Sequence, residues 1–246
     1  MYNNSQLLKN TDARMWLSRQ LKRIHIYELK LIMPWLVGLC VKNHNIAYET
    51  LIPLCINDLQ LAYSFYFELI FYSLDNFHKQ RLSNIKKKFL NVISKDFKSE
   101  IEKTELFIQF INDVICLSSS FEVWNEKSSK WFAVHKAVLM PWDVNIKCVG
   151  IQGEGISIFN SATKPWKIPF IVKKKGKDTI MNILVKFEDV RKDKLTMVVA
   201  EYLKKICMTY VDIDLYCVFP INTEMGWIEM VEHSNTLYDI KYKFKT

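Results

Sequence analysis

A lysine inside an apolar segment is the residue of this chain best placed for chemistry. The segment from Asn182 to Thr196 reads N-I-L-V-K-F-E-D-V-R-K-D-K-L-T, which predicts a strand, a short acidic turn and the start of a helix. Side chains alternate along a strand, so Lys186 projects over a half-buried surface and requires an anion. That anion is Glu188, Asp189 or Asp193 of the same chain, or the phosphate of a ligand. On this strand alone, an edge lysine that reaches solvent is the favoured interpretation.

Two further segments combine apolar strands with polar groups. Gly226 to Ser234 reads G-W-I-E-M-V-E-H-S, and by itself it indicates a core strand that runs into a polar segment. Ser157 to Phe170 predicts two strands joined by a turn of small residues at 160–163. Such a turn can offer backbone N–H groups and hydroxyls to a phosphate, and a tight hairpin explains it equally well.

Other catalytic and metal-binding patterns are missing from the sequence. The five histidines are scattered, with no pair at helical spacing, and no cysteines are clustered at the spacing of a zinc site. The sequence also lacks a nucleophile elbow, a P-loop and a dinucleotide-binding glycine motif. We therefore expect no metal site within this chain.

The composition indicates a helix-rich chain with a substantial core. Half of the 246 residues are apolar and 13% are aromatic. Glycine and proline number 6 each, which is 12 of 246 residues. A turn-rich β-sandwich, a propeller or a glycine-rich dinucleotide fold is therefore excluded.

Residues 12–117 predict one helix after another. Pro34 and Pro53 are expected to break the earlier runs, and short polar joints favour antiparallel packing of neighbouring helices. In the last run, apolar residues recur at three- and four-residue steps, which is typical of an amphipathic helix. Three helical segments are predicted after the first run, at 46–58, 59–78 and 82–117.

The pattern changes at Ser118, where we place a domain boundary between residues 1–118 and residues 119–246. Residues 126–130 read as part of a polar stretch, and β-branched alternation follows it. A helix over 190–207 is predicted to pack on one face of an antiparallel sheet, through Leu195, Val198, Val199, Tyr202, Leu203 and Ile206. The fold class is α+β, with the helical domain before the sheet. The predicted strands are 146–151, 156–160, 166–172, 180–187, 214–219 and 227–231.

Taken in order, these segments resemble the N-terminal lobe of the phosphatidylinositol 3-kinase and 4-kinase family. The phosphate-loop hairpin of that family resembles Ile158 to Pro165, and its lysine strand with the acidic turn resembles Ile183 to Leu195. Its hinge, of the form G-L-I-E-V-V-x-x-S-x-T-I, is similar to Gly226 to Leu237. Upstream, Met33 to Val37 resembles the L-P-Q-L-V segment of the helical accessory domain, and 64–69 resembles its aromatic helix. The resemblance favours the phosphatidylinositol 3-kinase branch.

The resemblance implies an ATP-binding site. By it, Lys186 contacts the ATP phosphates and Asp193 lines the inner end of the nucleotide pocket. The carbonyl of Glu229 and the amide of Val231 bind the adenine edge, with Met230 between them. Ser161 is placed in the phosphate loop by the same comparison.

The resemblance also implies what the chain lacks. In this family the D-R-H-x-x-N and D-F-G motifs of the C-terminal lobe orient the attacking hydroxyl and bind Mg²⁺. The sequence contains neither motif, so we expect no catalytic residue here and an inactive fragment of a lipid kinase. The complete enzyme would use ATP and Mg²⁺ to phosphorylate the inositol ring of a membrane phosphoinositide. A regulatory subunit is a further possible partner.

Charge and cysteine usage bear on location and partners. The net charge of +8 is spread evenly and fits work beside anionic surfaces or phosphorylated ligands. The six cysteines mostly sit in apolar runs and are interpreted as buried thiols in a reducing compartment. No apolar leader begins the sequence, and its longest uncharged apolar stretch, 31–41, is too short to cross a bilayer. We expect a cytoplasmic protein, peripheral at membranes.

Two readings compete with the lipid kinase. One is a naturally truncated, non-catalytic binding or regulatory module that uses the helical domain. The other is a nucleic-acid binder drawn by the positive charge, which we disfavour because the charge is spread and no recognition motif is present. The lysine run 173–177 is interpreted as a solvated hairpin tip or, alternatively, as a contact with anionic lipid.

Overall fold

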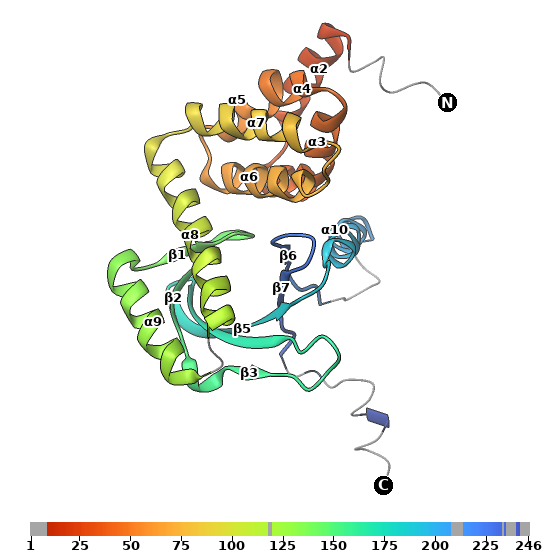
Figure 1. Ribbon diagram of the computed structural model, residues 1–246. Helices are drawn as coiled ribbons and strands as arrows, with labels where there is room; N and C mark the ends of the chain where they lie inside the picture. The colour runs from red at the N-terminus through yellow and green to blue at the C-terminus, as the bar shows by residue number, and fades with distance from the viewer. Residues whose placement is uncertain (1–8, 118–119, 208–213, 233, 235–239, 242–246) are drawn as a thin grey trace.

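The computed structural model describes residues 9–117, 120–207, 214–232, 234 and 240–241. Helices come first and an antiparallel sheet follows, so the α+β class predicted from the sequence is confirmed (Figure 1). The first part contains α2 (Thr11–Leu21), α3 (Ile26–Lys42), α4 (His44–Ile46), the π-helical turn η1 (Ala47–Leu51), α5 (Ile52–Cys55), α6 (Leu59–Ser73) and α7 (Lys79–Val92).

Helix α6 is the centre of the helical part. It begins at Leu59, and the carboxylate of the preceding Asp58 accepts a hydrogen bond from the N–H of Leu61 at 2.8 Å and caps the helix. The helix is buried on most of its surface because it contacts α3, α7 and strand β2 (Asp143–Ile151). Tyr63 and Phe65 are fully buried. An apolar helix without a polar face is expected in such a position.

The prediction that the prolines break the helices is wrong for Pro34. This residue lies inside α3, where it removes the donor of one backbone hydrogen bond. Its neighbours Met33 and Val37 are buried in the core, and this burial offsets the lost bond. Pro53 lies at the start of α5, where a missing N–H costs least, directly after the π-helical turn.

The helix predicted over 82–117 is two helices. α7 ends at Val92, and α8 (Lys95–Leu117) begins after a break at which the Ser94 hydroxyl accepts the N–H of Phe97 at 3.2 Å. The apolar pattern continues across the break because Phe89, Ile93 and Ile101 all enter the same core. The apolar periodicity therefore did not reveal that one helix ends and another begins at Ser94.

Helix α9 (Phe121–His135) was missed by the sequence analysis, which read residues 126–130 as part of a polar stretch. Within it, Trp124 and Ser128 are buried four residues apart, while Glu126 and Lys130 form an exposed ion pair at 2.5 Å. One narrow buried stripe beneath a charged surface is sufficient for a helix.

The sheet has the strand order β1-β2-β4-β5-β7-β6, with β3 paired to the start of β4, and its pairs are antiparallel. Each predicted strand corresponds to an observed one, although the predicted 214–219 is reduced to three residues and β1 was not predicted. The strands are β1 (Val138–Met140), β2, β3 (Ser157–Ile158), β4 (Trp166–Lys174), β5 (Lys177–Lys186), β6 (Val218–Pro220) and β7 (Gly226–Glu229).

The two faces of the sheet have different neighbours. On one face Ile183 and Val185 are fully buried, together with Phe170 and Trp227, whose rings meet Phe107 of α8 with ring centroids 5.4 and 6.1 Å away. The opposite face carries a small apolar cluster of Val190, Val218 and Ile228, with Leu184 and Met197 packed against it. Helices α8 and α9 cover the first face, and α10 (Arg191–Ile206) lies beside the second (Figure 1).

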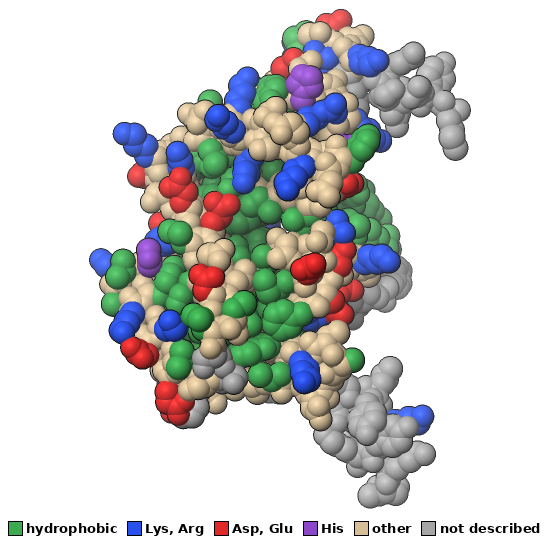
Figure 2. Space-filling model, viewed as in Figure 1, with side chains coloured by type: hydrophobic (Ala, Val, Ile, Leu, Met, Phe, Trp, Pro, Cys, Tyr) green, Lys and Arg blue, Asp and Glu red, His purple; other side chains and the backbone are tan. Residues whose placement is uncertain are grey.

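Helix α10 is confirmed, but the face predicted to be buried is largely exposed. Met197 makes the contact with the sheet cluster, whereas Leu203 and Ile206 are 51% and 59% exposed. Apolar side chains accordingly appear at the surface where α10 lies (Figure 2). It packs mainly against the edge strand β6 and α3, and its Lys194 also contacts α6, so only one side of the helix is covered. The other exposed members of the predicted stripe are Leu195, Val199 and Tyr202.

A buried ion pair connects the helical part to α10. The ammonium of Lys194 lies 2.5 Å from a carboxylate oxygen of Glu68 in α6, and each side chain is only 11% exposed. The same ammonium lies 4.4 Å from the ring centre of Phe71. One continuous core runs from the helices into the sheet, and the boundary at Ser118 stays a prediction. No helix in the described part of the chain has the length and apolar character needed to cross a bilayer.

The cysteines divide into two groups. Cys40, Cys55 and Cys148 are buried as predicted, whereas Cys116 and Cys207 are exposed at helix ends, against the expectation for buried thiols. Burial raises the pKa of Cys40 to about 12 and also raises the pKa values of Cys55 and Cys148. Of these five cysteines, only Cys116 and Cys207 are therefore accessible to a reagent in the native protein.

We predict that iodoacetamide at neutral pH modifies Cys116 and Cys207 in the native protein and leaves Cys40, Cys55 and Cys148 unmodified, because the buried thiols are inaccessible and protonated. Peptide mass spectrometry measures the site of each adduct. The denatured protein serves as the control, in which all the cysteines react. Rapid labelling of Cys148 in the native protein would contradict the burial of this thiol in the core.

Replacing Glu68 by Ala is expected to destabilise the protein by about 3–5 kcal/mol, because Lys194 is then left buried without its counter-charge. The double variant Glu68→Ala, Lys194→Met should recover most of this loss, since a buried pair replaced by apolar groups is close to neutral. Urea unfolding followed by circular dichroism measures both. Glu126→Ala, which breaks an exposed pair, is the matched control and should leave the unfolding midpoint unchanged. Equal shifts of the unfolding midpoint in Glu68→Ala and Glu126→Ala would contradict the burial of the Glu68–Lys194 pair.

Candidate functional site

The sheet face opposite α8 and α9 carries the lysine singled out in the sequence. Lys186 is the last residue of β5, on the same face as Leu184 and Asn182. β5 pairs with β7, and the N–H of Met230, just beyond β7, donates to the carbonyl of Asn182 at 2.8 Å. The lysine and the hinge-like segment therefore belong to adjacent, hydrogen-bonded strands. Lys186 lies four residues along β5 from Asn182, the residue that bonds to Met230, which corresponds to about 13 Å at the rise of a strand.

The structure supplies a protein anion for Lys186. Its ammonium lies 2.9 Å from a carboxylate oxygen of Glu188, and its side chain is 29% exposed. Asp189 instead binds Arg191 at 2.6 Å, and this hydrogen-bonded guanidinium lowers the pKa of Asp189. Asp193 lies in the first turn of α10 and has no ion-pair partner among the described residues. Of the three acids considered, Glu188 is thus the partner of Lys186, and a phosphate would have to displace it.

The hinge-like residues line a cleft of about 430 Å³ next to β5, to which Glu229, Met230 and Val231 all contribute. The side chain of Glu229 turns back into the fold, where its carboxylate accepts the N–H of Cys217 at 3.1 Å. The N–H of Val231 has no hydrogen-bond partner within the described part of the chain. An open backbone donor at the edge of a cleft can bind a planar acceptor such as a nucleobase.

The end of the hinge motif is only partly described. The hydroxyl of Ser234 donates to the carbonyl of Val231 at 2.8 Å and so stabilises the chain beyond the cleft. Thr236 and Leu237, which the resemblance includes in the motif, lie outside the described residues.

Ser161 is exposed in the turn between β3 and β4. Its N–H donates to the carbonyl of Phe159 at 3.0 Å, and the N–H of Lys164 donates back to Ser161 at 3.1 Å. Lys164 has a φ of 41°, in the left-handed region that is costly for a lysine. The N–H groups of Ala162 and Thr163 have no partners among the described residues, so the turn leaves two donors open to an anion.

The predicted site residues are therefore only partly brought together. Glu229, Met230 and Val231 share the cleft, whereas Lys186, Asp193 and Ser161 do not line it. Lys186 lies on the same sheet face as Asn182, which lines the cleft, and Asp193 lies on α10 beside that face. The arrangement offers an ammonium and open N–H donors, which are groups that bind phosphates and nucleobases.

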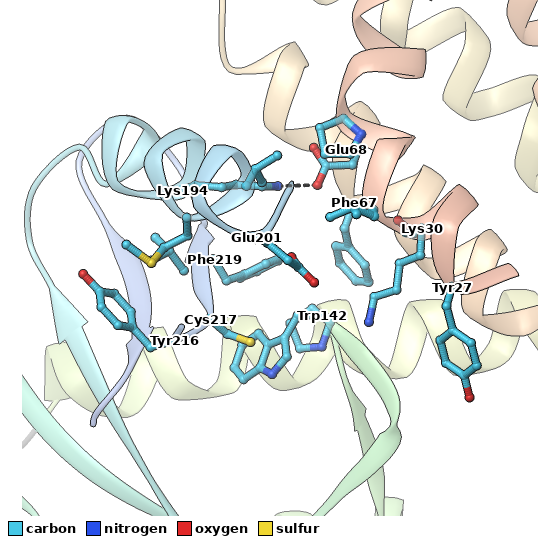
Figure 3. Close-up of a pocket in the computed structure, with 17 residues that line it drawn as sticks. Tyr27, Lys30, Phe67, Glu68, Trp142, Lys194, Glu201, Tyr216, Cys217 and Phe219 are labelled. Atoms are coloured by element: carbon cyan, nitrogen blue, oxygen red, sulfur yellow. Dashed lines mark hydrogen bonds and ion pairs between the residues drawn. The ribbon is translucent and has the colours of Figure 1, made fainter. Parts of the chain in front are cut away.

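A second cavity, of about 310 Å³, lies between the helical part and the β6 edge of the sheet (Figure 3). Its walls include Lys30 of α3, Glu68 of α6, Trp142 of the β1–β2 turn, and Lys194 and Glu201 of α10. The sequence analysis did not single out any of these five residues. One signal was available, because Glu68 is the single charge in the apolar run L-A-Y-S-F-Y-F-E-L-I-F.

Metal binding has no support in the described residues, among which no group of three or more histidine, cysteine, aspartate or glutamate side chains is arranged to hold an ion. No protein-family model matches this chain, and no curated protein sequence matches it.

Proposed function

We propose that this chain is the helical accessory domain and kinase N-lobe of a phosphatidylinositol 3-kinase, and that its sheet binds ATP. The observation that carries the proposal is the pairing of β5, which ends at Lys186, with β7, which leads into Glu229–Val231, while the face that carries Lys186 is not covered by α8 and α9. A nucleotide laid along that face could reach the lysine with its phosphates and the open Val231 N–H with its base.

Each group would have a distinct role toward ATP. The Lys186 ammonium would exchange its ion pair with Glu188 for the phosphates, which carry more charge. The open N–H groups at Ala162 and Thr163 would hold the phosphates from the opposite side. Val231 would donate to the adenine edge and Glu229 would offer its carbonyl. ATP supplies the phosphoryl group, and Mg²⁺ would neutralise its charge in the complete enzyme.

The reaction itself requires residues that this sequence does not contain. The proposed enzyme transfers the γ-phosphate to a ring hydroxyl of a phosphoinositide at a membrane surface, with the D-R-H-x-x-N and D-F-G motifs supplied by a C-terminal lobe. Cytoplasmic location, peripheral membrane association and a regulatory subunit belong to the same proposal. The lysine run 173–177 forms the exposed tip of the β4–β5 hairpin, a position from which it could contact anionic lipid.

The first test is the native gene product. We expect its transcript to continue past the codon for Thr246 and its intact mass to exceed 29.2 kDa. Immunoprecipitated native protein should transfer labelled phosphate from ATP to phosphatidylinositol vesicles. A native protein that ends at Thr246 would overturn the kinase and favour the non-catalytic binding module.

We predict that Lys186→Met in that native protein abolishes lipid phosphorylation, because the phosphates lose their ammonium contact. The fold should be retained, since the lysine forms only a half-exposed ion pair. Lys95→Met, at the exposed start of α8 and outside every proposed contact, is the control and should retain full activity. Phosphorylated lipid is measured by thin-layer chromatography, and activity retained by Lys186→Met would refute the role assigned to this lysine.

Removing the open hinge donor should weaken nucleotide binding selectively. Val231→Pro eliminates the backbone N–H, whereas Val231→Ala removes the branched side chain and keeps the N–H. One hydrogen bond to a ligand is worth about 1 kcal/mol, so we expect a roughly fivefold loss of affinity for a fluorescent ATP analogue in the proline variant. The unfolding midpoints of the two variants are compared in parallel. Equal affinities in variants of equal stability would exclude Val231 as the adenine contact.

A further inference from the structure

Lysines from separate segments line one open cavity at the end of the sheet where α8 packs against β1 (Figure 1). The cavity has a volume of about 1010 Å³. Its lysines come from α8, from the connection between α9 and β1, from β2, and from the end of β4 and the turn that follows. They are Lys103, Lys136, Lys147, Lys174 and Lys175.

The two acids of the same lining do not balance these lysines. Glu100 pairs with Lys103 at 3.2 Å, and the carboxylate of Asp143 accepts the N–H and the side-chain amide of Asn145, each at 3.0 Å. The other four lysines have no ion-pair partner within the described part of the chain. Five lysines against two acids leave an excess of three positive charges. A hollow lined by one sign of charge concentrates its field and attracts anions.

Lysines also face lysines in the strands that border the cavity. Lys147 of β2 lies directly opposite Lys173 of β4, and Lys174 lies opposite Lys177 across the β4–β5 hairpin. Like charges directly opposite each other destabilise an antiparallel pair. Among the described residues Asp178 relieves this repulsion at Lys173 alone, with the two charged groups 3.9 Å apart. The chain thus keeps cations together at a cost in stability, which an anionic ligand would offset.

Two of the cavity lysines occupy backbone conformations that suit glycine or asparagine. Lys136 follows α9 with a φ of 58°, and Lys175 has a φ of 51° in the two-residue turn that it forms with Gly176. Glycine is the usual residue with positive φ after a helix, and Asn-Gly is preferred in a hairpin turn with two positive φ values. A lysine at each position supplies a charge where another residue type would be more stable.

We propose that this cavity binds a compact ligand that carries several phosphate groups, either free in solution or as the headgroup of a lipid. Ammonium groups bind phosphates as point charges, and lysines from separate segments each reach a different phosphate of such a ligand. The volume is at the upper end of the range for small-molecule sites and exceeds what a single phosphate ion needs. The inference does not rest on the proposed ATP site, because Lys186 and Val231 do not line this cavity.

Isothermal titration of the 246-residue chain with inositol hexakisphosphate, at an ionic strength of about 0.15 M, tests the site. We expect a dissociation constant of about 1–10 µM, and inorganic phosphate should bind at least about a hundredfold more weakly because it meets fewer lysines. The affinity should fall as salt is added, since the contacts are between exposed charges. Failure of inositol hexakisphosphate to bind at up to about 1 mM would overturn the proposal.

A double variant separates the ligand contacts from the stability of the fold. Lys136→Gly with Lys175→Asn removes two cavity charges and relieves both backbone conformations. It should bind inositol hexakisphosphate about tenfold more weakly, while its unfolding midpoint stays equal or rises. Lys79→Gln with Lys87→Gln removes two exposed lysines of α7, outside the cavity, and is the matched control that should bind as the wild type does. Equal losses of affinity in the two double variants would indicate attraction to net charge alone and would overturn the site.

Vesicles identify the source of the phosphates. Phosphatidylcholine vesicles that contain phosphatidylinositol bisphosphate are compared with vesicles in which phosphatidylserine supplies the same total charge. Binding to the first kind alone, with competition by inositol hexakisphosphate, assigns a lipid headgroup, whereas binding of the soluble ligand alone assigns a free one. Equal binding to both kinds would overturn the proposal, because a general anionic surface would then be sufficient.

Lys186→Met distinguishes this site from the proposed ATP site. Because Lys186 does not line the cavity, this variant should bind inositol hexakisphosphate as the wild type does, whether or not ATP binding is lost. A loss of inositol hexakisphosphate affinity in Lys186→Met, at an unchanged unfolding midpoint, would place the ligand at Lys186 and overturn the site proposed here.

Discussion

Burial of one face of the sheet around Phe107 is the constraint on which the rest of the structure depends. This ring of α8 meets Phe170 and Trp227 of the sheet, and also Trp131 of α9. Since side chains alternate along a strand, fixing Ile183 and Val185 in this core places Lys186 on the opposite face. A shift of one residue in the pairing would move the ammonium into the core, so the aromatic cluster also fixes the register of β5.

The polar groups proposed to bind a ligand therefore lie away from the aromatic core. β7 continues the pairing up to Glu229, and the chain then leaves the sheet with the Val231 N–H unpaired by any described group. Lys186 ends β5 and Ser161 lies in the turn before β4, so the polar groups come from strand ends and turns rather than from strand interiors. A rigid, half-buried sheet can position such groups without burying them.

The junction between the helices and the sheet is held by polar as well as apolar contacts. There the chain buries a charged pair, Glu68 and Lys194, and leaves polar atoms unsatisfied next to it. A buried ion pair contributes little net stability compared with apolar groups of the same volume, although removing one partner alone is costly. Because Lys194 directly follows Asp193, this junction and the proposed nucleotide face share helix α10.

The sequence by itself determined the elements whose signal is local. Alternation in Asn182 to Lys186 and the periodicity of 190–207 were sufficient to place β5 and α10 in order. The tolerance of Pro34 inside α3 and the narrow buried stripe of α9 were decided by tertiary packing, which outweighs local propensity. The cap at Ser94 is a local signal, but the continuous apolar pattern on both sides of it concealed the break. The largely exposed side of α10 was likewise set by what surrounds the helix.

The candidate sites divide in the same way. Lys186 could be singled out because a lysine interrupting an apolar strand is a local anomaly, and the hinge-like segment was visible as a short motif. The sequence left three acids as candidate partners for Lys186, and only the folded turn shows that the partner is Glu188. The cavity of Lys30, Glu68, Trp142 and Glu201 is assembled from separate segments, and no spacing within a single segment can encode their meeting. Only the tertiary structure, by packing α3 and α6 against α10 and β6, brings those charges together.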